Sequence, residues 1–172
     1  MDEVLTQELR RLAQVAASRK PPVDPDPFEC VRVARAPGVQ MYANKNERLG
    51  IEFAVERVNF PGVQTMDPRI VRIPPGRNNE RHKHAHESLF VILEGRGEVL
   101  IGDKRVPVQR GDVAFVPRWL YHQTINTGDS ELVVLAVTDF GFASAVLGDY
   151  DQHHRLRGSG VEAVQQEKES RS

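Results

Sequence analysis

The middle of this chain is a succession of short segments rich in β-branched and aromatic residues, separated by Gly, Pro, Asn and Asp. Such segments are typical of β-strands, because branched and aromatic side chains pack well on a pleated surface while the separating residues favour turns. We expect strands at residues 31–33, 51–58, 70–73, 89–93, 98–101, 113–116, 121–125 and 132–137. About eight short strands predict an all-β fold, a sandwich or a barrel.

The two ends of the chain have a different character. Apolar residues within positions 2–18 recur at mostly three- to five-residue intervals among Gln, Glu and Arg, which predicts one amphipathic helix. We expect this helix within residues 1–20, a proline-rich linker at 21–30, a single barrel domain at 31–150 and a disordered tail at 151–172. A short helical turn is expected at 142–147.

Composition excludes several classes of protein. The chain has 172 residues, a single cysteine and a formal net charge of -1. One thiol cannot close an internal disulfide, and a nearly balanced charge supplies no basic stripe for a nucleic acid. The longest apolar run, 132–137, is far shorter than the roughly 20 residues that span a bilayer. We therefore expect a cytoplasmic protein that binds neither nucleic acid nor membrane.

The histidines are unevenly placed. His82 and His84 alternate, so in an extended segment both project from the same face, close enough to share one cation. His122 follows a proline-containing turn that leads into another predicted strand. Two imidazoles from one segment and one from a separate strand are a ligand pattern typical of a metal site.

The spacing of these residues resembles the cupin family. The first cupin motif, G-x5-H-x-H-x3-E-x6-G, is matched in every spacing, with serine in place of the glutamate, by Gly76, His82, His84, Ser88 and Gly95. The second motif, G-x5-P-x-G-x2-H-x3-N, is matched with tryptophan in place of its middle glycine by Gly111, Pro117, Trp119, His122 and Asn126. The resemblance implies a single jelly-roll barrel whose mouth holds one metal, with His82, His84 and His122 as its ligands.

Within the cupins, the chain looks most like the three-histidine, ring-cleaving dioxygenases of the gentisate and salicylate type. Because Ser88 replaces the carboxylate ligand, a divalent metal would keep its full charge. Iron(II) with three protein ligands would retain open positions for a bidentate substrate and dioxygen. We expect a non-haem Fe(II) dioxygenase acting on a small aromatic or carboxylated substrate. The alternatives are an isomerase or lyase using Zn, Ni or Mn, and a non-catalytic small-molecule-binding cupin.

Four further residues are candidates for the site. Trp119 and Tyr121 flank the third histidine and either line the pocket, stacking on a planar substrate, or pack in the core or rim. Arg72 alternates with apolar neighbours and is our first candidate for a substrate carboxylate, followed by Gln123.

The remaining polar residues near the histidines are expected to play no part. His86 falls in a predicted turn and is expected to face solvent rather than provide a fourth ligand, and Glu87 has the wrong strand parity to replace Ser88. His153 and His154 are expected to be exposed.

Open jelly-roll edges and the apolar stripe of the N-terminal helix together predict a homodimer.

Overall fold

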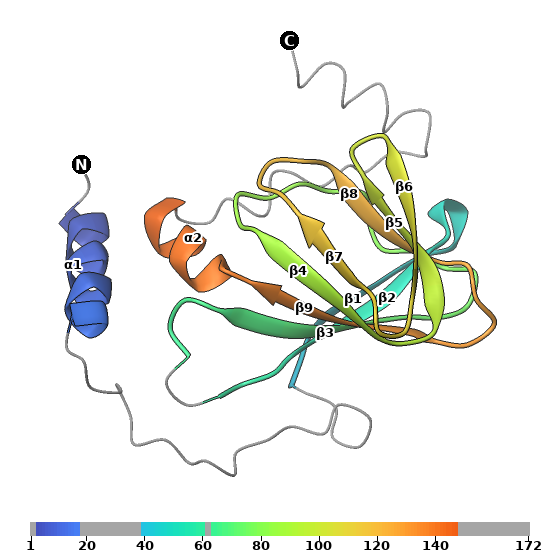
Figure 1. The fold of residues 1–172 in the computed structure, drawn as a ribbon, viewed down its shortest axis with the longest axis horizontal. Helices are drawn as coiled ribbons and strands as arrows, with labels where there is room; N and C mark the ends of the chain where they lie inside the picture. The colour runs from blue at the N-terminus through green and yellow to red at the C-terminus, as the bar shows by residue number, and fades with distance from the viewer. Residues whose placement is uncertain (1–2, 18–38, 61–62, 148–172) are drawn as a thin grey trace.

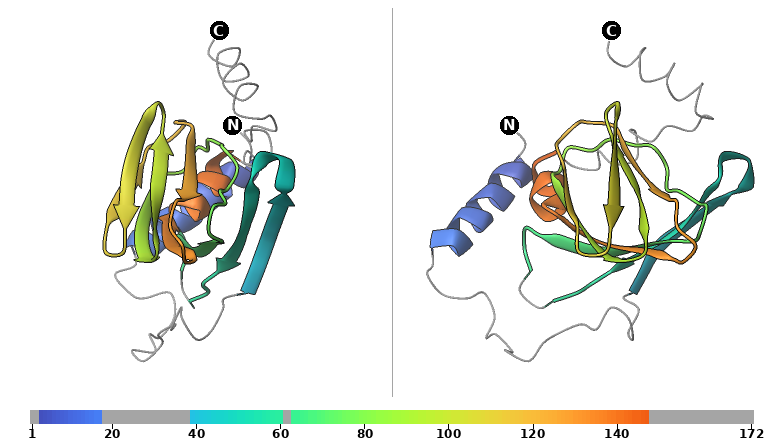
Figure 2. Two further views of the ribbon diagram at one scale, coloured as in Figure 1. Left: turned by 90° about the vertical axis from the view of Figure 1, so that its right-hand side faces the viewer. Right: turned by 45° about the vertical axis from the view of Figure 1, so that its right-hand side comes forward.

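The computed structural model describes residues 3–17, 39–60 and 63–147, arranged as strands in two facing layers with a helix pair at one end (Figures 1 and 2). The elements in chain order are α1 (Glu3–Ala17), β1 (Val39–Asn46), the 3-10 turn η1 (Glu47–Leu49), β2 (Ile51–Arg57), β3 (Asp67–Ile73), β4 (Ser88–Glu94), β5 (Arg96–Ile101), β6 (Lys104–Gln109), β7 (Val113–Val116), β8 (His122–Asn126), β9 (Leu132–Thr138) and α2 (Phe140–Leu147).

Nine strands form two antiparallel sheets in the part of the chain that the structure describes. The larger sheet has the order β1-β2-β3-β9-β4-β7, and the smaller has the order β6-β5-β8. Isolated bridges connect residues 78 and 82, which precede β4, with the smaller sheet. The fold is the all-β jelly roll with an N-terminal helix that the sequence predicts, and α1 lies beside α2 (Figure 1).

The core lies between the two sheets. In β2 the buried residues Ile51, Phe53 and Val55 face inward at the period of two that a strand requires. The most deeply buried members of the core come from both sheets: Ile73, Ile92, Val99, Val116 and Leu132. Gly95 joins β4 to β5 with φ +77, and a Cβ at this position would lie 2.5 Å from the carbonyl oxygen of Glu131. The last glycine of the first motif is therefore required by the backbone.

Two strands were not expected from the sequence. β6 is exposed at all but one position and pairs only with β5, so it is an edge strand that tolerates Pro107. β1 is also an edge strand, and its sequence, in which half of the residues are polar, carries little strand signal. Both were missed because their sequences contain no run of β-branched or aromatic residues. The edge strand β7 does contain one and was predicted, although Val113 and Phe115 are exposed.

The predicted helices are present. α1 occupies 3–17, and α2 begins two residues before the predicted start at 142. The predicted strand at 31–33, the linker at 21–30 and the tail at 151–172, including His153 and His154, lie outside the described residues. No helix among the described residues is long and apolar enough to cross a membrane.

Candidate metal centre

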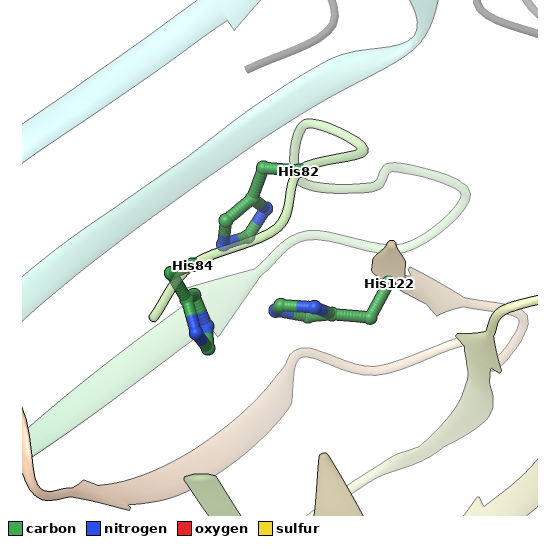
Figure 3. Close-up of side chains that lie close together, drawn as sticks. All are labelled: His82, His84 and His122. Atoms are coloured by element: carbon green, nitrogen blue, oxygen red, sulfur yellow. The ribbon is translucent and has the colours of Figure 1, made fainter. Parts of the chain in front are cut away.

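Three histidine rings converge between the two sheets (Figure 3). His82 and His84 lie in the segment that precedes β4, and His122 is the first residue of β8. One ring nitrogen from each histidine lies within 4.8 Å of the other two. His122 is fully buried and His84 is nearly so. The structure therefore brings together the three residues that the sequence singled out as metal ligands.

Backbone carbonyls orient all three rings. The Nδ1 atoms of His82, His84 and His122 lie 2.9, 2.8 and 3.0 Å from the carbonyl oxygens of Glu80, His86 and Leu120, in that order. Because a carbonyl only accepts hydrogen bonds, each Nδ1 carries the ring proton and each Nε2 keeps its lone pair. This is the tautomer that a metal-binding histidine uses when its other nitrogen is held by a carbonyl. The donor set therefore fits a divalent metal.

Ser88 stands beside the histidines, where the cupin motif has its glutamate. It is the first residue of β4 and is only 1% exposed, and together with the three histidines it lines a cavity that is described below. Its Oγ atom is buried and makes no hydrogen bond to any described residue. A buried hydroxyl without a partner is costly, so this atom marks a position from which a ligand or a water molecule would accept a hydrogen bond.

His86 is the clearest correction to the sequence prediction. Instead of facing solvent it is 3% exposed, and its ring stacks on that of His84 with centroids 3.5 Å apart. α2 covers the segment, because the ring of Phe140 meets His86 edge-on and Ala143 packs against Ala85. Burial lowers the pKa of His86 to about 2, and the electrostatic influence of the neighbouring His84 and Arg69 adds to the effect. The chain does bend at Ala85 and His86, but both residues are buried, and only Glu87 beside them is exposed.

A cavity opens from the three histidines between the sheets. The cavity and its open mouth together enclose about 530 Å³. Its remaining lining is mainly apolar and aromatic, with a few polar groups: Tyr42, Phe53, Val55, Arg69, Val71, Asn79, Phe90, Ala136 and Thr138. Neither Tyr42 nor Phe90 was predicted from the sequence to be a site residue, and no strand was predicted around Tyr42. Arg69 and Val71 are two residues apart in β3 and so project from the same face of the sheet. This spacing was a signal in the sequence from which the position of Arg69 could have been predicted.

Arg72, the arginine chosen from the sequence, lies away from this cavity. Its Nε and Nη1 atoms pair with Glu56 and Glu131, each at 3.1 Å, across the other face of the sheet. The sequence correctly predicted that Arg72 projects from the face opposite to that of its neighbours Val71 and Ile73. The prediction that this face turns toward the cavity was wrong. Val71 lines the cavity and Ile73 lies in the core, so the residue between them points outward.

The other three candidates also lie outside the cavity lining. Trp119 is 47% exposed, whereas Tyr121 is buried, with the Nζ atom of Lys83 4.8 Å from its ring centroid. Gln123 donates hydrogen bonds from Nε2 to Asn78 Oδ1 at 3.0 Å and to the carbonyl oxygen of Asn79 at 2.8 Å. Because Asn79 lines the cavity, Gln123 supports the wall rather than contacting its contents.

Comparison with known proteins agrees with the fold and the site. The cupin domain profile matches residues 69–138. The chain is 34% identical over 109 residues to 1-methylthio-D-xylulose 5-phosphate methylsulfurylase of Rhodospirillum rubrum, a match that covers 61% of this chain and 69% of the relative. The crystal structure of a cupin-2 domain protein from Rhodospirillum rubrum superimposes with a TM-score of 0.59 at 22% identity, covering 86% of this chain and 90% of that one. The chain belongs to the cupin family.

Among the other relatives, two are named as dioxygenases. The 1-hydroxy-2-naphthoate 1,2-dioxygenase of Nocardioides sp. (strain KP7) is 26% identical over 87 residues, which cover 51% of this chain and 22% of that enzyme. The gentisate 1,2-dioxygenase of Haloferax sp. is 25% identical over 105 residues, covering 60% of this chain and 27% of that enzyme. The chain thus spans about a quarter of the length of these dioxygenases, and the resemblance that the sequence indicated is confirmed at the level of the domain.

Proposed function

We propose that this cupin is a mononuclear non-haem iron(II) dioxygenase that acts on a small oxygenated substrate, aromatic or carboxylated. The observation that carries the proposal is the donor set: three imidazoles and no Asp or Glu among the described residues that line the cavity. Three ligands on one side of an octahedral metal leave positions open, as in the two-histidine carboxylate sites of other oxygenases. The similarity to the naphthoate and gentisate dioxygenases supports it.

The residues of the chain would prepare the site. Three carbonyl contacts hold the imidazole rings in one tautomer, so binding a metal requires no loss of a ring proton. Phe53, Phe90 and Val71 give the cavity apolar walls that suit a planar ring and exclude water from it. Iron(II) bound at the three histidines would supply the redox chemistry that reaction with dioxygen requires.

A second candidate function follows from a different relative. The methylsulfurylase shares a larger part of its length with this chain than either dioxygenase, and its name describes no oxygenase. This leaves open the alternative stated from the sequence, an isomerase or lyase in which Zn, Ni or Mn, bound at the same histidines, would polarise a carbonyl group. The two functions differ in their need for dioxygen.

Oxygen consumption separates the two. Protein reconstituted anaerobically with Fe(II) is mixed with aerated buffer containing a catechol, gentisate, salicylate or 1,3-diketone, and oxygen uptake is followed with an electrode. We expect uptake with at least one of these classes, and none with His84→Ala. Absence of uptake across the panel, in protein shown to hold one iron per chain, would contradict the dioxygenase proposal.

A further inference from the structure

The charge balance of the cavity is unusual for a site that would hold a divalent cation. Among the described residues that line it, Arg69 is the only arginine or lysine, and none is Asp or Glu. Ser88 stands in place of the family's glutamate, so no carboxylate there offsets the charge of a metal. With metal bound, the cavity is therefore strongly cationic, and its contents need negative charge to balance it.

Arg69 is held in a fixed orientation within this cavity. It is 9% exposed, and its Nε and Nη2 atoms both donate to Asp67 Oδ2, at 2.8 and 2.5 Å. The centre of its guanidinium lies 4.8 Å from the ring centroid of Phe140. Asp67 thus holds one side of the fork, and Nη1 makes no hydrogen bond to the residues that the structure describes. An arginine fixed in this way loses little conformational entropy when it binds an anion.

Asp67 does not neutralise the local charge. Its second oxygen, Oδ1, lies 3.3 Å from Nε of Arg57, so one carboxylate serves two guanidinium groups. The trio of Arg57, Asp67 and Arg69 carries a net charge of about +1, because arginine is effectively always protonated. An additional anion at Arg69 would offset the net charge of the trio, and any further negative charge would offset part of that of the metal.

The arginine lies near the metal ligands. The ring of Phe140 contacts both Arg69 and His86, and the ring centroids of Phe140 and His86 are 5.5 Å apart. His86 in turn stacks on His84. One aromatic ring and one stacked imidazole therefore connect the guanidinium to a metal ligand, and both ends of this series border the same cavity.

From these observations we propose that Arg69 is the substrate-anchoring residue of the cavity. The substrate is then a small organic anion whose carboxylate pairs with Arg69 while a neighbouring hydroxyl or carbonyl oxygen faces the three histidines. The proposal extends the proposed function and rests on it, because a bound anion is a substrate only if the protein is an enzyme. It also assigns the role to Arg69 instead of Arg72, the arginine that the sequence pattern favours.

Salicylate and salicylamide test this, because they have nearly the same shape and differ in the charge of one group. Zn(II)-loaded protein, which does not turn over with dioxygen, is titrated with each compound in a calorimeter. We expect salicylate to bind at least about tenfold more tightly than salicylamide, as a charge-assisted hydrogen bond would give. In Arg69→Gln this preference should fall to near unity. Equal binding of the two compounds by the wild-type protein, or binding of neither, would overturn the proposal.

Arg72→Gln is the matched control, since it removes the same charge from the other face of the same strand. It should keep the preference for salicylate. Equal loss in both variants would mean that the overall charge of the sheet, and not Arg69, selects the anion, and would overturn the assignment.

Loss of Arg69 leaves Asp67 short of a partner and risks unfolding, so the double variant Asp67→Asn/Arg69→Gln is measured as well. It replaces the ion pair by two amides of similar size. It should fold, which circular dichroism checks, and show no preference for salicylate; a retained preference would overturn the proposal. Because binding to Zn(II) protein needs no dioxygen, an Arg69-dependent preference without oxygen uptake by the iron form would contradict only the dioxygenase function.

Discussion

His82 and His122 exchange two backbone hydrogen bonds, from the amide of His82 to the carbonyl of His122 at 3.0 Å and from the amide of His122 to the carbonyl of His82 at 2.8 Å. This antiparallel bridge brings their ring centroids within 4.4 Å. The backbone thus assembles ligands that are far apart in the sequence before any metal arrives. Such preorganisation lowers the cost of binding, because the side chains do not have to be gathered by the ion.

The first prediction concerns metal content. We expect the purified protein, after reconstitution, to hold one divalent metal per chain, and His84→Ala and His122→Ala each to lose most of it, since two imidazoles bind far more weakly than three. Elemental analysis of the desalted proteins measures this. His86→Ala is the control: it removes a ring next to the site but keeps the carbonyl that orients His84. Undiminished metal in both of the first two variants would refute the assignment.

A second prediction concerns Asn126, the last residue of the second motif. Its amide donates to the carbonyls of Ile73 and Ser130, both at 2.8 Å, and its Oδ1 accepts from the amide of Gly128 at 2.9 Å. The side chain is buried and ties the β8–β9 turn to the end of β3. Removing the side chain leaves these two carbonyls and one amide without their hydrogen-bond partner. Asn126→Ala should therefore destabilise the fold by about 2–4 kcal/mol.

Urea denaturation measures this loss as a lower midpoint with an unchanged slope. Asn46→Ala is the comparison, because Asn46 is exposed and accepts a single hydrogen bond, from the amide of Leu49 at 3.3 Å. It should cost about 1 kcal/mol or less. Similar losses in the two variants would show that the bonds of Asn126 contribute little.

The third prediction concerns the backbone at Trp119. This residue has φ +59, the left-handed conformation that glycine adopts without strain, and it occupies the glycine position of the second motif. Trp119→Gly and Trp119→Ala both remove the indole, and they differ in the strain of a Cβ at positive φ. We expect the glycine variant to be more stable by about 1 kcal/mol. Thermal melts of the pair decide it, and a more stable alanine variant would show that the backbone relaxes.

The parts of the fold that the sequence predicted are those fixed by burial. Central strands such as β4 and β9 have apolar residues on both faces and can be recognised as runs of apolar residues in the sequence. The edge strands β1 and β6 contain no such run. The ligand set was predictable for a related reason. His82 and His84 are two residues apart, and in an extended backbone two residues at this spacing project from the same face.

What the sequence did not provide was which side of an element faces the cavity. The choice of Arg72 over Arg69 depended on the face of β3, and the exposure of His86 depended on α2 folding back over it. Both are tertiary facts with no local signature. Asp67, two residues from Arg69, is on the same side of β3 and pairs with it in the interior.

The last prediction concerns Ser88, where the chain departs from the cupin pattern. Its side chain faces the cavity beside the histidines and its Oγ lacks a hydrogen-bond partner among the described residues. In Ser88→Glu a carboxylate would reach into this space, add an anionic ligand and occupy a coordination position. We expect tighter retention of divalent metal during dialysis against a chelator, and slower oxygen uptake by the iron form because fewer positions stay open.

Ser88→Gln separates charge from size, since glutamine fills nearly the same volume without an anion. It should gain little metal affinity, so that a gain confined to Ser88→Glu is assigned to the carboxylate. A polarising isomerase of the ordinary cupin kind tolerates four protein ligands and would keep its turnover in Ser88→Glu. Oxygen uptake that is equal or faster with glutamate at position 88 would therefore show that the missing carboxylate is not what equips this site for dioxygen.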